Sequence, residues 1–93
     1  MIKDDELEIL EEAVREWGDK QIGMLTEECG ELLSAMNKFL RGRVSKEAVV
    51  EELADVMIMC DQMLIMLDAV DDGYKVRAEK IQRLQSRLEQ YYD

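Results

Sequence analysis

The chain contains no proline and no histidine, and of its 93 residues only two are cysteine and 5% are aromatic. Without proline, no position forbids a long uninterrupted helix. Without histidine, and with two cysteines far apart in sequence, sites for zinc, copper or haem lack their usual ligands. Cys29 and Cys60 are too few for a disulfide framework, so we expect both to be small buried apolar residues.

Long apolar runs and a cationic leader are also missing. The longest apolar stretch, around Val56–Leu67, is interrupted by Asp61 and Gln62 and is too short to span a bilayer. Residues Met1–Asp5 lack the cationic and apolar regions of a signal peptide. We therefore expect a cytoplasmic protein without a membrane partner. The net charge of −10 also argues against binding a nucleic acid polymer, which favours basic surfaces.

The spacing of apolar residues predicts an all-α fold with a single domain over residues 1–93. Short links between the helices favour an antiparallel four-helix bundle. The second helix is expected to turn Ile22, Leu25, Leu32, Leu33, Met36 and Leu40 inward. The predicted helices are Lys3–Trp17, Lys20–Leu40, Lys46–Val70 and Tyr74–Tyr92, with a turn at Asp71-Asp72-Gly73 before the last one.

The third predicted helix is apolar almost all the way round. Ala54, Ile58 and Ile65 lie on the side opposite Glu52, so two of its faces need cover in a very small domain. A second copy of the chain can supply that cover. We therefore expect a homo-oligomer, in the simplest case a dimer built on this helix.

Two predicted helices carry acids where the apolar pattern places the core. Glu28 shares a face with Leu32 and Ala35, and Glu52 shares one with Val56 and Met59. Glu31 and Asp55 follow three residues later on the same sides. An unpaired ionised carboxylate removed from water costs several kcal/mol, against a total stability of roughly 5–15 kcal/mol. The acids can take up protons, pair with basic side chains or share a cation. Their matching spacing favours a hard divalent ion, Mg²⁺ or Mn²⁺.

Metal ions held by carboxylates commonly recruit phosphates, and several side chains are candidates for binding a nucleotide. Lys38 lies on the flank of the second helix that carries Glu27 and Glu31, and Lys80 and Arg83 lie on the last helix. Trp17 and Gln21 are candidates for stacking on a base and hydrogen-bonding its edge. Each also has a plainer interpretation: the charged residues as a solvated or salt-bridged helix face, and Trp17 as a packing residue.

The acidic motif resembles that of the MazG-type all-α nucleoside triphosphate pyrophosphohydrolases. It reads Glu27-Glu28-x-x-Glu31, a spacer of twenty residues, then Glu52-x-x-Asp55. The resemblance extends over about residues 14 to 84. Its wider context includes Trp17-Gly18, Gln21, Lys38 and Arg41-Gly42.

This resemblance implies Mg²⁺-dependent hydrolysis of nucleoside triphosphates, ribo or deoxyribo, to a monophosphate and pyrophosphate, in a role that clears unwanted nucleotides. The implied metal ligands are Glu28, Glu31, Glu52 and Asp55, with Glu27 orienting or activating water. Lys38, Lys80 and Arg83 would stabilise charge on the phosphates. The resemblance also implies a dimer or a dimer of dimers. Two alternatives stay open: a non-catalytic acidic helical interaction or regulatory module, and an enzyme like phosphoribosyl-ATP pyrophosphatase.

Overall fold

The computed structural model describes residues 1–92, and every regular element in this range is an α-helix. The all-α prediction is therefore confirmed. The helices are α1 (Asp4–Trp17), α2 (Lys20–Leu40), α3 (Lys46–Met66) and α4 (Val70–Tyr92). In residues 1–92, no helix combines the length and the apolar character that crossing a lipid bilayer requires.

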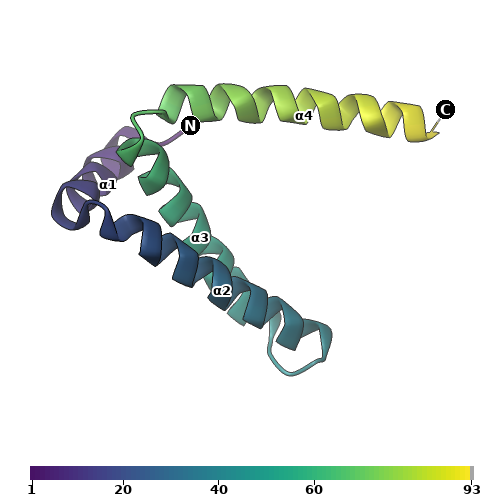
Figure 1. Ribbon diagram of the computed structural model, residues 1–93. Helices are drawn as coiled ribbons and strands as arrows, with labels where there is room; N and C mark the ends of the chain where they lie inside the picture. The colour runs from purple at the N-terminus through teal and green to yellow at the C-terminus, as the bar shows by residue number, and fades with distance from the viewer. Residues whose placement is uncertain (93) are drawn as a thin grey trace.

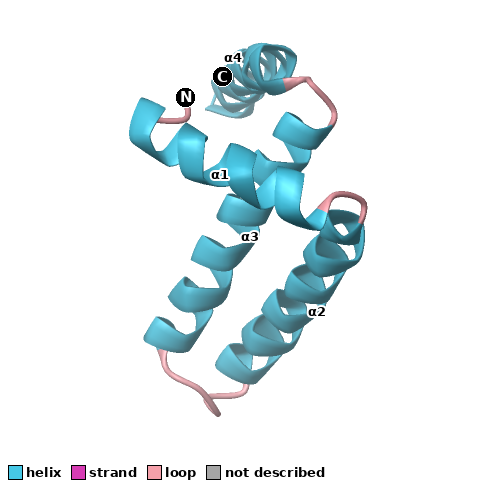
Figure 2. Ribbon diagram, turned by 90° about the vertical axis from the view of Figure 1, so that its left-hand side faces the viewer, coloured by secondary structure: helices cyan, strands magenta, loops and turns pink. Residues whose placement is uncertain are grey.

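The centre of the fold is an antiparallel hairpin made by α2 and α3, which lie side by side along their length (Figures 1 and 2). Both helices have 21 residues, so they match in length. The connection is a short loop that follows Leu40, in which Gly42 adopts a φ of 70°. Glycine takes this left-handed conformation without the steric cost that a Cβ atom brings. The hairpin sets which residues of α2 and α3 face each other.

Helix α1 lies across the end of the hairpin far from this loop (Figure 2). The amide Nε2 of Gln21 on α2 donates a hydrogen bond of 3.2 Å to the backbone carbonyl of Ala13 on α1. Gln21 is fully buried, and Met59 and Gln62 of α3 are also buried. The most protected part of the chain is therefore the end of the hairpin next to α1.

Helix α4 leaves the hairpin at an elbow and extends away from the other helices (Figure 1). Asp68 turns the chain with a φ of 52°, a conformation that Asp tolerates better than most residues. Gly73 then packs against Leu64, and the Tyr74 hydroxyl donates a hydrogen bond of 2.8 Å to Asp61 Oδ1. Within the described chain, α4 contacts only α3. These contacts hold the first turns of α4 and leave the rest unsupported.

The predicted antiparallel four-helix bundle is thus only partly present in one chain: α2 and α3 are antiparallel, and α4 does not close against them. The expected turn at Asp71–Gly73 is wrong, since α3 ends at Met66 and these residues form the first turn of α4. Acidic side chains suit that position because the N-terminus of a helix carries positive partial charge. Gly73 serves close packing between two helices and not a turn.

Several apolar side chains that were expected to face inward are exposed in the single chain. Ile22, Leu33, Met36 and Leu40 are 51%, 63%, 47% and 82% exposed, so for these four the prediction is wrong. The radius of gyration is 16.1 Å, whereas a compact chain of this length has about 12 Å. The isolated chain is extended because α4 covers none of these side chains.

Replacing Gly73 by alanine tests the elbow. A Cβ atom at position 73 would lie 2.6 Å from Leu64 Cδ2, whereas one at Gly23 meets nothing within 4 Å. Both glycines lie inside helices, where alanine is favoured by about 0.8–1 kcal/mol. We expect Gly23→Ala to raise the free energy of unfolding by about that amount. Gly73→Ala should not raise it, because overpacking against Leu64 offsets the helix preference of alanine. Urea denaturation measures both, and equal stabilisation by the two changes would contradict the described packing.

Candidate carboxylate site

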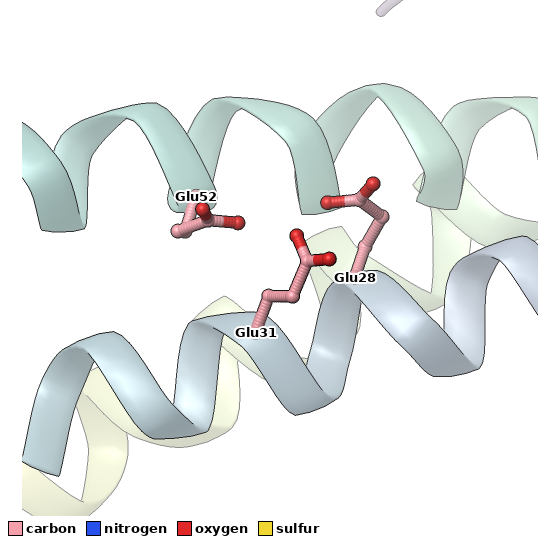
Figure 3. A group of neighbouring side chains, drawn as sticks. All are labelled: Glu28, Glu31 and Glu52. Atoms are coloured by element: carbon pink, nitrogen blue, oxygen red, sulfur yellow. The ribbon is translucent and has the colours of Figure 1, made fainter.

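Three glutamates meet in the space between α2 and α3. Glu28 and Glu31 lie one turn apart on α2, and Glu52 projects toward them from α3 (Figure 3). One carboxylate oxygen of each lies within 4.8 Å of those of the other two. The antiparallel hairpin produces this arrangement, because it places the middle of α3 opposite the middle of α2. We call these three residues the glutamate cluster.

The cluster is partly removed from water. Glu28 and Glu52 are half-buried and Glu31 is exposed. The Oε2 atoms of Glu28 and Glu52 are both buried, and neither has a hydrogen-bond partner within residues 1–92. A buried oxygen that accepts no hydrogen bond lowers the free energy of unfolding. The rest of the described fold provides no hydrogen bond to either of these two oxygens.

Burial raises the pKa of the Glu28 carboxyl, and the negative charges of Glu31, Asp55, Glu52 and Glu27 raise it further. The pKa of Glu52 is raised by burial first, then by the charges of Glu31 and Asp55, a hydrogen bond with Glu31 and the charge of Glu51. Neutral acids and bound cations both relieve such repulsion. The site therefore favours either extra protons or a positive ion.

Asp55 and Glu27 lie at the edge of the glutamate cluster. Asp55 is exposed, and its charge raises the pKa of both Glu28 and Glu52, but its carboxylate is not one of the three grouped within 4.8 Å. Glu27 is exposed on α2 and acts on the pKa of Glu28. Of the four acids predicted as metal ligands, the structure thus groups three and leaves Asp55 beside them.

A groove of about 290 Å³ begins at the glutamate cluster. Glu31, Glu51 and Glu52 line one part of it, and Lys38 of α2 lines another. Ser34, Ala35 and Ala48 contribute small side chains to its wall, which leaves the space open. Lys38 is therefore the predicted phosphate-binding residue that the fold brings beside the acids. Glu51, which the sequence reasoning did not assign to the site, also lines this groove.

The other predicted site residues lie elsewhere in the single chain. Lys80 and Arg83 are on the part of α4 that extends away from the hairpin, so the described chain does not bring them to the glutamate cluster. Trp17 ends α1 and is 46% exposed. Gln21 is buried under α1 and already donates to Ala13. Roles for these four side chains in binding a nucleotide stay predictions.

Gln62, which the sequence reasoning did not assign to a site, lies at the level of the predicted base-binding residue Gln21, away from the glutamate cluster. Gln21 precedes Glu31 by ten residues and Gln62 follows Glu52 by ten, so the two glutamines occupy the same level of the antiparallel pair. Both are buried, and the Oε1 atom of each has no hydrogen-bond partner within residues 1–92. The signal available in the sequence was Gln62 within the apolar stretch around Val56–Leu67.

The cysteines differ from the prediction. Cys29 and Cys60 are both exposed and, within the described chain, both are free thiols, so the expectation that they are buried is wrong. Partial burial and the neighbouring Cys29 and Asp61 raise the pKa of Cys60. Because Cys29 acts on the pKa of Cys60, the two thiols lie near each other on the hairpin.

A cavity of about 590 Å³ lies away from the glutamate cluster, lined on one side by the N-terminus and α1 and on the other by the end of α3 and the start of α4. Leu7, Ile65 and Val70 give it an apolar lining, and several carboxylates surround it.

Comparisons with protein-family models, with curated proteins and with solved structures found no match for this chain.

Neutralising a cluster glutamate should stabilise the metal-free protein at neutral pH. The raised pKa values mean that Glu28 and Glu52 favour folding below their unfolded pKa of about 4.3, and that this contribution is lost as the pH rises. We therefore expect Glu52→Gln, in chelator, to raise Tm at pH 7.5 and to have a smaller effect at pH 4. The control is Glu12→Gln on the exposed face of α1, which removes the same charge. An equal rise in Tm from Glu52→Gln at both pH values would contradict the raised pKa of Glu52.

Proposed function

We propose that the protein is a Mg²⁺-dependent nucleoside triphosphate pyrophosphohydrolase of the all-α, MazG-like type. The observation that carries the proposal is the glutamate cluster, whose Glu28 and Glu52 each bury an oxygen without a partner, at the head of a groove that also contains Lys38. The substrate is a ribo- or deoxyribonucleoside triphosphate, cleaved to a monophosphate and pyrophosphate. The setting that fits this role is the cytoplasm, as part of clearing unwanted nucleotides.

The residues present fit a hard divalent cation. Mg²⁺ and Mn²⁺ favour oxygen ligands, and the two unpartnered oxygens of Glu28 and Glu52 are atoms that such an ion satisfies. Glu31 completes the set, and Asp55 lies close enough to raise the pKa of two of its members. When bound, the ion supplies Lewis-acid polarisation of phosphate oxygens and lowers the pKa of water.

The chain's own residues contribute binding, orientation and proton transfer. Lys38 stabilises negative charge on the phosphates in the groove, as an ammonium group does at a phosphoryl-transfer site. Glu27, an exposed carboxylate next to Glu28, orients the attacking water and accepts its proton. Trp17 and Gln21 at the junction of α1 and α2 bind the base. Lys80 and Arg83 add positive charge from the α4 of another chain, since the protein works as a homodimer or a dimer of dimers.

A second candidate function is a non-catalytic helical interaction module. Its support is the large number of exposed apolar side chains together with a long helix that extends from the body of the chain (Figure 1). Proteins can share a fold without sharing an activity. In this case the glutamate cluster is a cation or partner site without turnover.

The first test is pyrophosphate release from a panel of nucleoside triphosphates and phosphoribosyl-ATP, with Mg²⁺ and with chelator. We expect metal-dependent pyrophosphate from at least one compound, and a loss of about 10²–10³ in kcat for Glu52→Gln, because a group that organises charge is removed. Glu12→Gln is the matched control and should retain activity. Orthophosphate as the product would contradict the proposal. If folded, metal-bound protein releases neither pyrophosphate nor orthophosphate from any compound, the result would favour the interaction module.

Lys38→Ala tests the groove. An interaction with a charged phosphate contributes about 1.5–3 kcal/mol, so we expect kcat/KM to fall by roughly 10- to 100-fold. Lys20→Ala removes the same charge from the exposed start of α2 and serves as the control. Equal, small effects of both changes would show that Lys38 does not contact the substrate.

A further inference from the structure

A pocket of about 290 Å³ lies at the elbow, between the second half of α3 and the first turns of α4. Its position follows from the path of the chain, because α4 leaves α3 at an angle and the two helices spread apart beyond their contact (Figure 1). Val56, Met57 and Leu64 give it an apolar wall, and their spacing places them on one side of α3. We call this space the elbow pocket.

The elbow pocket is separate from the carboxylate site. No residue of the glutamate cluster lines it, and it shares no lining residue with the groove that contains Lys38. Counted at 100° per residue, Met57 and Leu64 lie about 120–140° around α3 from Glu52. A ligand in the elbow pocket therefore meets side chains that the proposed nucleotide chemistry does not use.

Two contacts between α3 and α4 hold the inner corner of the elbow pocket. Gly73 packs against Leu64, and the Tyr74 hydroxyl donates its hydrogen bond of 2.8 Å to Asp61. This hydrogen bond raises the pKa of Tyr74, as do burial and the charge of Asp61, whereas the positive charge of Arg77 lowers it. Tyr74 and Asp61 are both half-buried. The pocket is thus formed by the fold itself, as ligand sites usually are.

The wall on α3 is apolar surface that the described chain leaves open to water. Met57 is 69% exposed, and Val56 and Leu64 are half-buried. Covering such surface with an apolar group is favourable, because apolar area is then removed from water. The ligand that this wall fits has an aliphatic body.

The charges at the elbow pocket favour an anionic end on that body. Asp61 is the acid of the pocket, and one of its oxygens already accepts the Tyr74 hydroxyl. Arg77 is exposed, and its guanidinium carries paired N–H donors that match a carboxylate. Residues 75–92 hold five Lys and Arg against two Asp and Glu, whereas residues 1–74 hold seven against nineteen. The α4 side of the pocket is therefore the basic part of an acidic chain.

The size of the elbow pocket limits the ligand. A volume of 290 Å³ is at the lower end of the range for small-molecule sites. One guanidinium matches one carboxylate group, whereas a nucleotide brings several phosphate charges. An aliphatic cation would meet the positive charge of Arg77. These features together fit a short amphipathic acid.

We propose that the elbow pocket binds a medium-chain fatty acid, with the aliphatic chain against Val56, Met57 and Leu64 and the carboxylate on Arg77. The ligand joins α3 to α4 beyond the contacts of Gly73 and Tyr74, and so it stabilises the elbow. This inference goes beyond the proposed nucleotide hydrolysis and does not depend on it.

The first test is titration calorimetry of the full-length protein with decanoate, kept below the concentration at which it forms micelles. We expect one site per chain with a Kd below about 1 mM. Arg77→Gln should raise Kd about tenfold, because the charge-assisted hydrogen bonds to the carboxylate are lost. The control is Lys75→Gln, which removes the same charge about 160° away around α4 and should leave Kd unchanged.

1-Decanol, which has the same chain without the charge, separates the role of the carboxylate. It should bind wild-type protein about as weakly as decanoate binds Arg77→Gln. Three results would each overturn the proposal: no saturable binding of decanoate, several equivalent sites per chain, or equal effects of Arg77→Gln and Lys75→Gln.

The second test uses the two native thiols. Cys60 lines the elbow pocket, and Cys29 is an exposed thiol of α2 that does not line it. Both are alkylated with iodoacetamide under reducing conditions, and mass spectrometry follows each site with and without decanoate. We expect decanoate to slow alkylation of Cys60 several-fold and to leave the rate at Cys29 unchanged.

Equal slowing at both thiols, or no slowing at Cys60, would contradict binding in the elbow pocket. A Cys60 that is unreactive without decanoate and becomes reactive only on dilution would show that a second copy of the chain occupies the pocket, which also overturns the proposal.

Discussion

Repulsion among three carboxylates held between two helices is the constraint on which the rest of this structure depends. The antiparallel pairing of α2 and α3 brings Glu28, Glu31 and Glu52 within 4.8 Å of one another and buries an oxygen of both Glu28 and Glu52 without a partner. Such an arrangement lowers stability in a chain that has few buried side chains to offset it. A bound cation, as proposed above, would relieve this repulsion.

The two sides of the α2–α3 hairpin differ in the residues that they expose. One side carries the groove with Lys38, and the opposite side exposes apolar residues such as Leu33, Leu53 and Met57. Because only Met59, Gln21 and Gln62 are buried among residues 1–92, the described chain has almost no core of its own. In the proposed homodimer, association of the chains would add directly to the stability of each one.

Helical periodicity and acid spacing predicted α1 and α2 closely, and they placed Glu28, Glu31 and Glu52 together because two helices with facing acids leave few arrangements. The path after α3 was not predictable in the same way. The sequence Asp71-Asp72-Gly73 suits a turn and the acidic start of a helix equally well, and only the contact of Gly73 with Leu64 decides between them. Nor does periodicity tell whether an apolar stripe such as that of α4 meets its own chain or another copy. Asp55, at the same spacing as Glu31, lies outside the closest group, and the spacing alone does not distinguish the two.

The most direct test of the central claim is a crystal structure of the protein grown with Mn²⁺, in which anomalous scattering locates the ion. The account predicts one or more ions between α2 and α3, coordinated by Glu28, Glu31 and Glu52. A structure of the protein at millimolar Mn²⁺ that shows these three carboxylates without an ion, or an ion only at other residues, would contradict it.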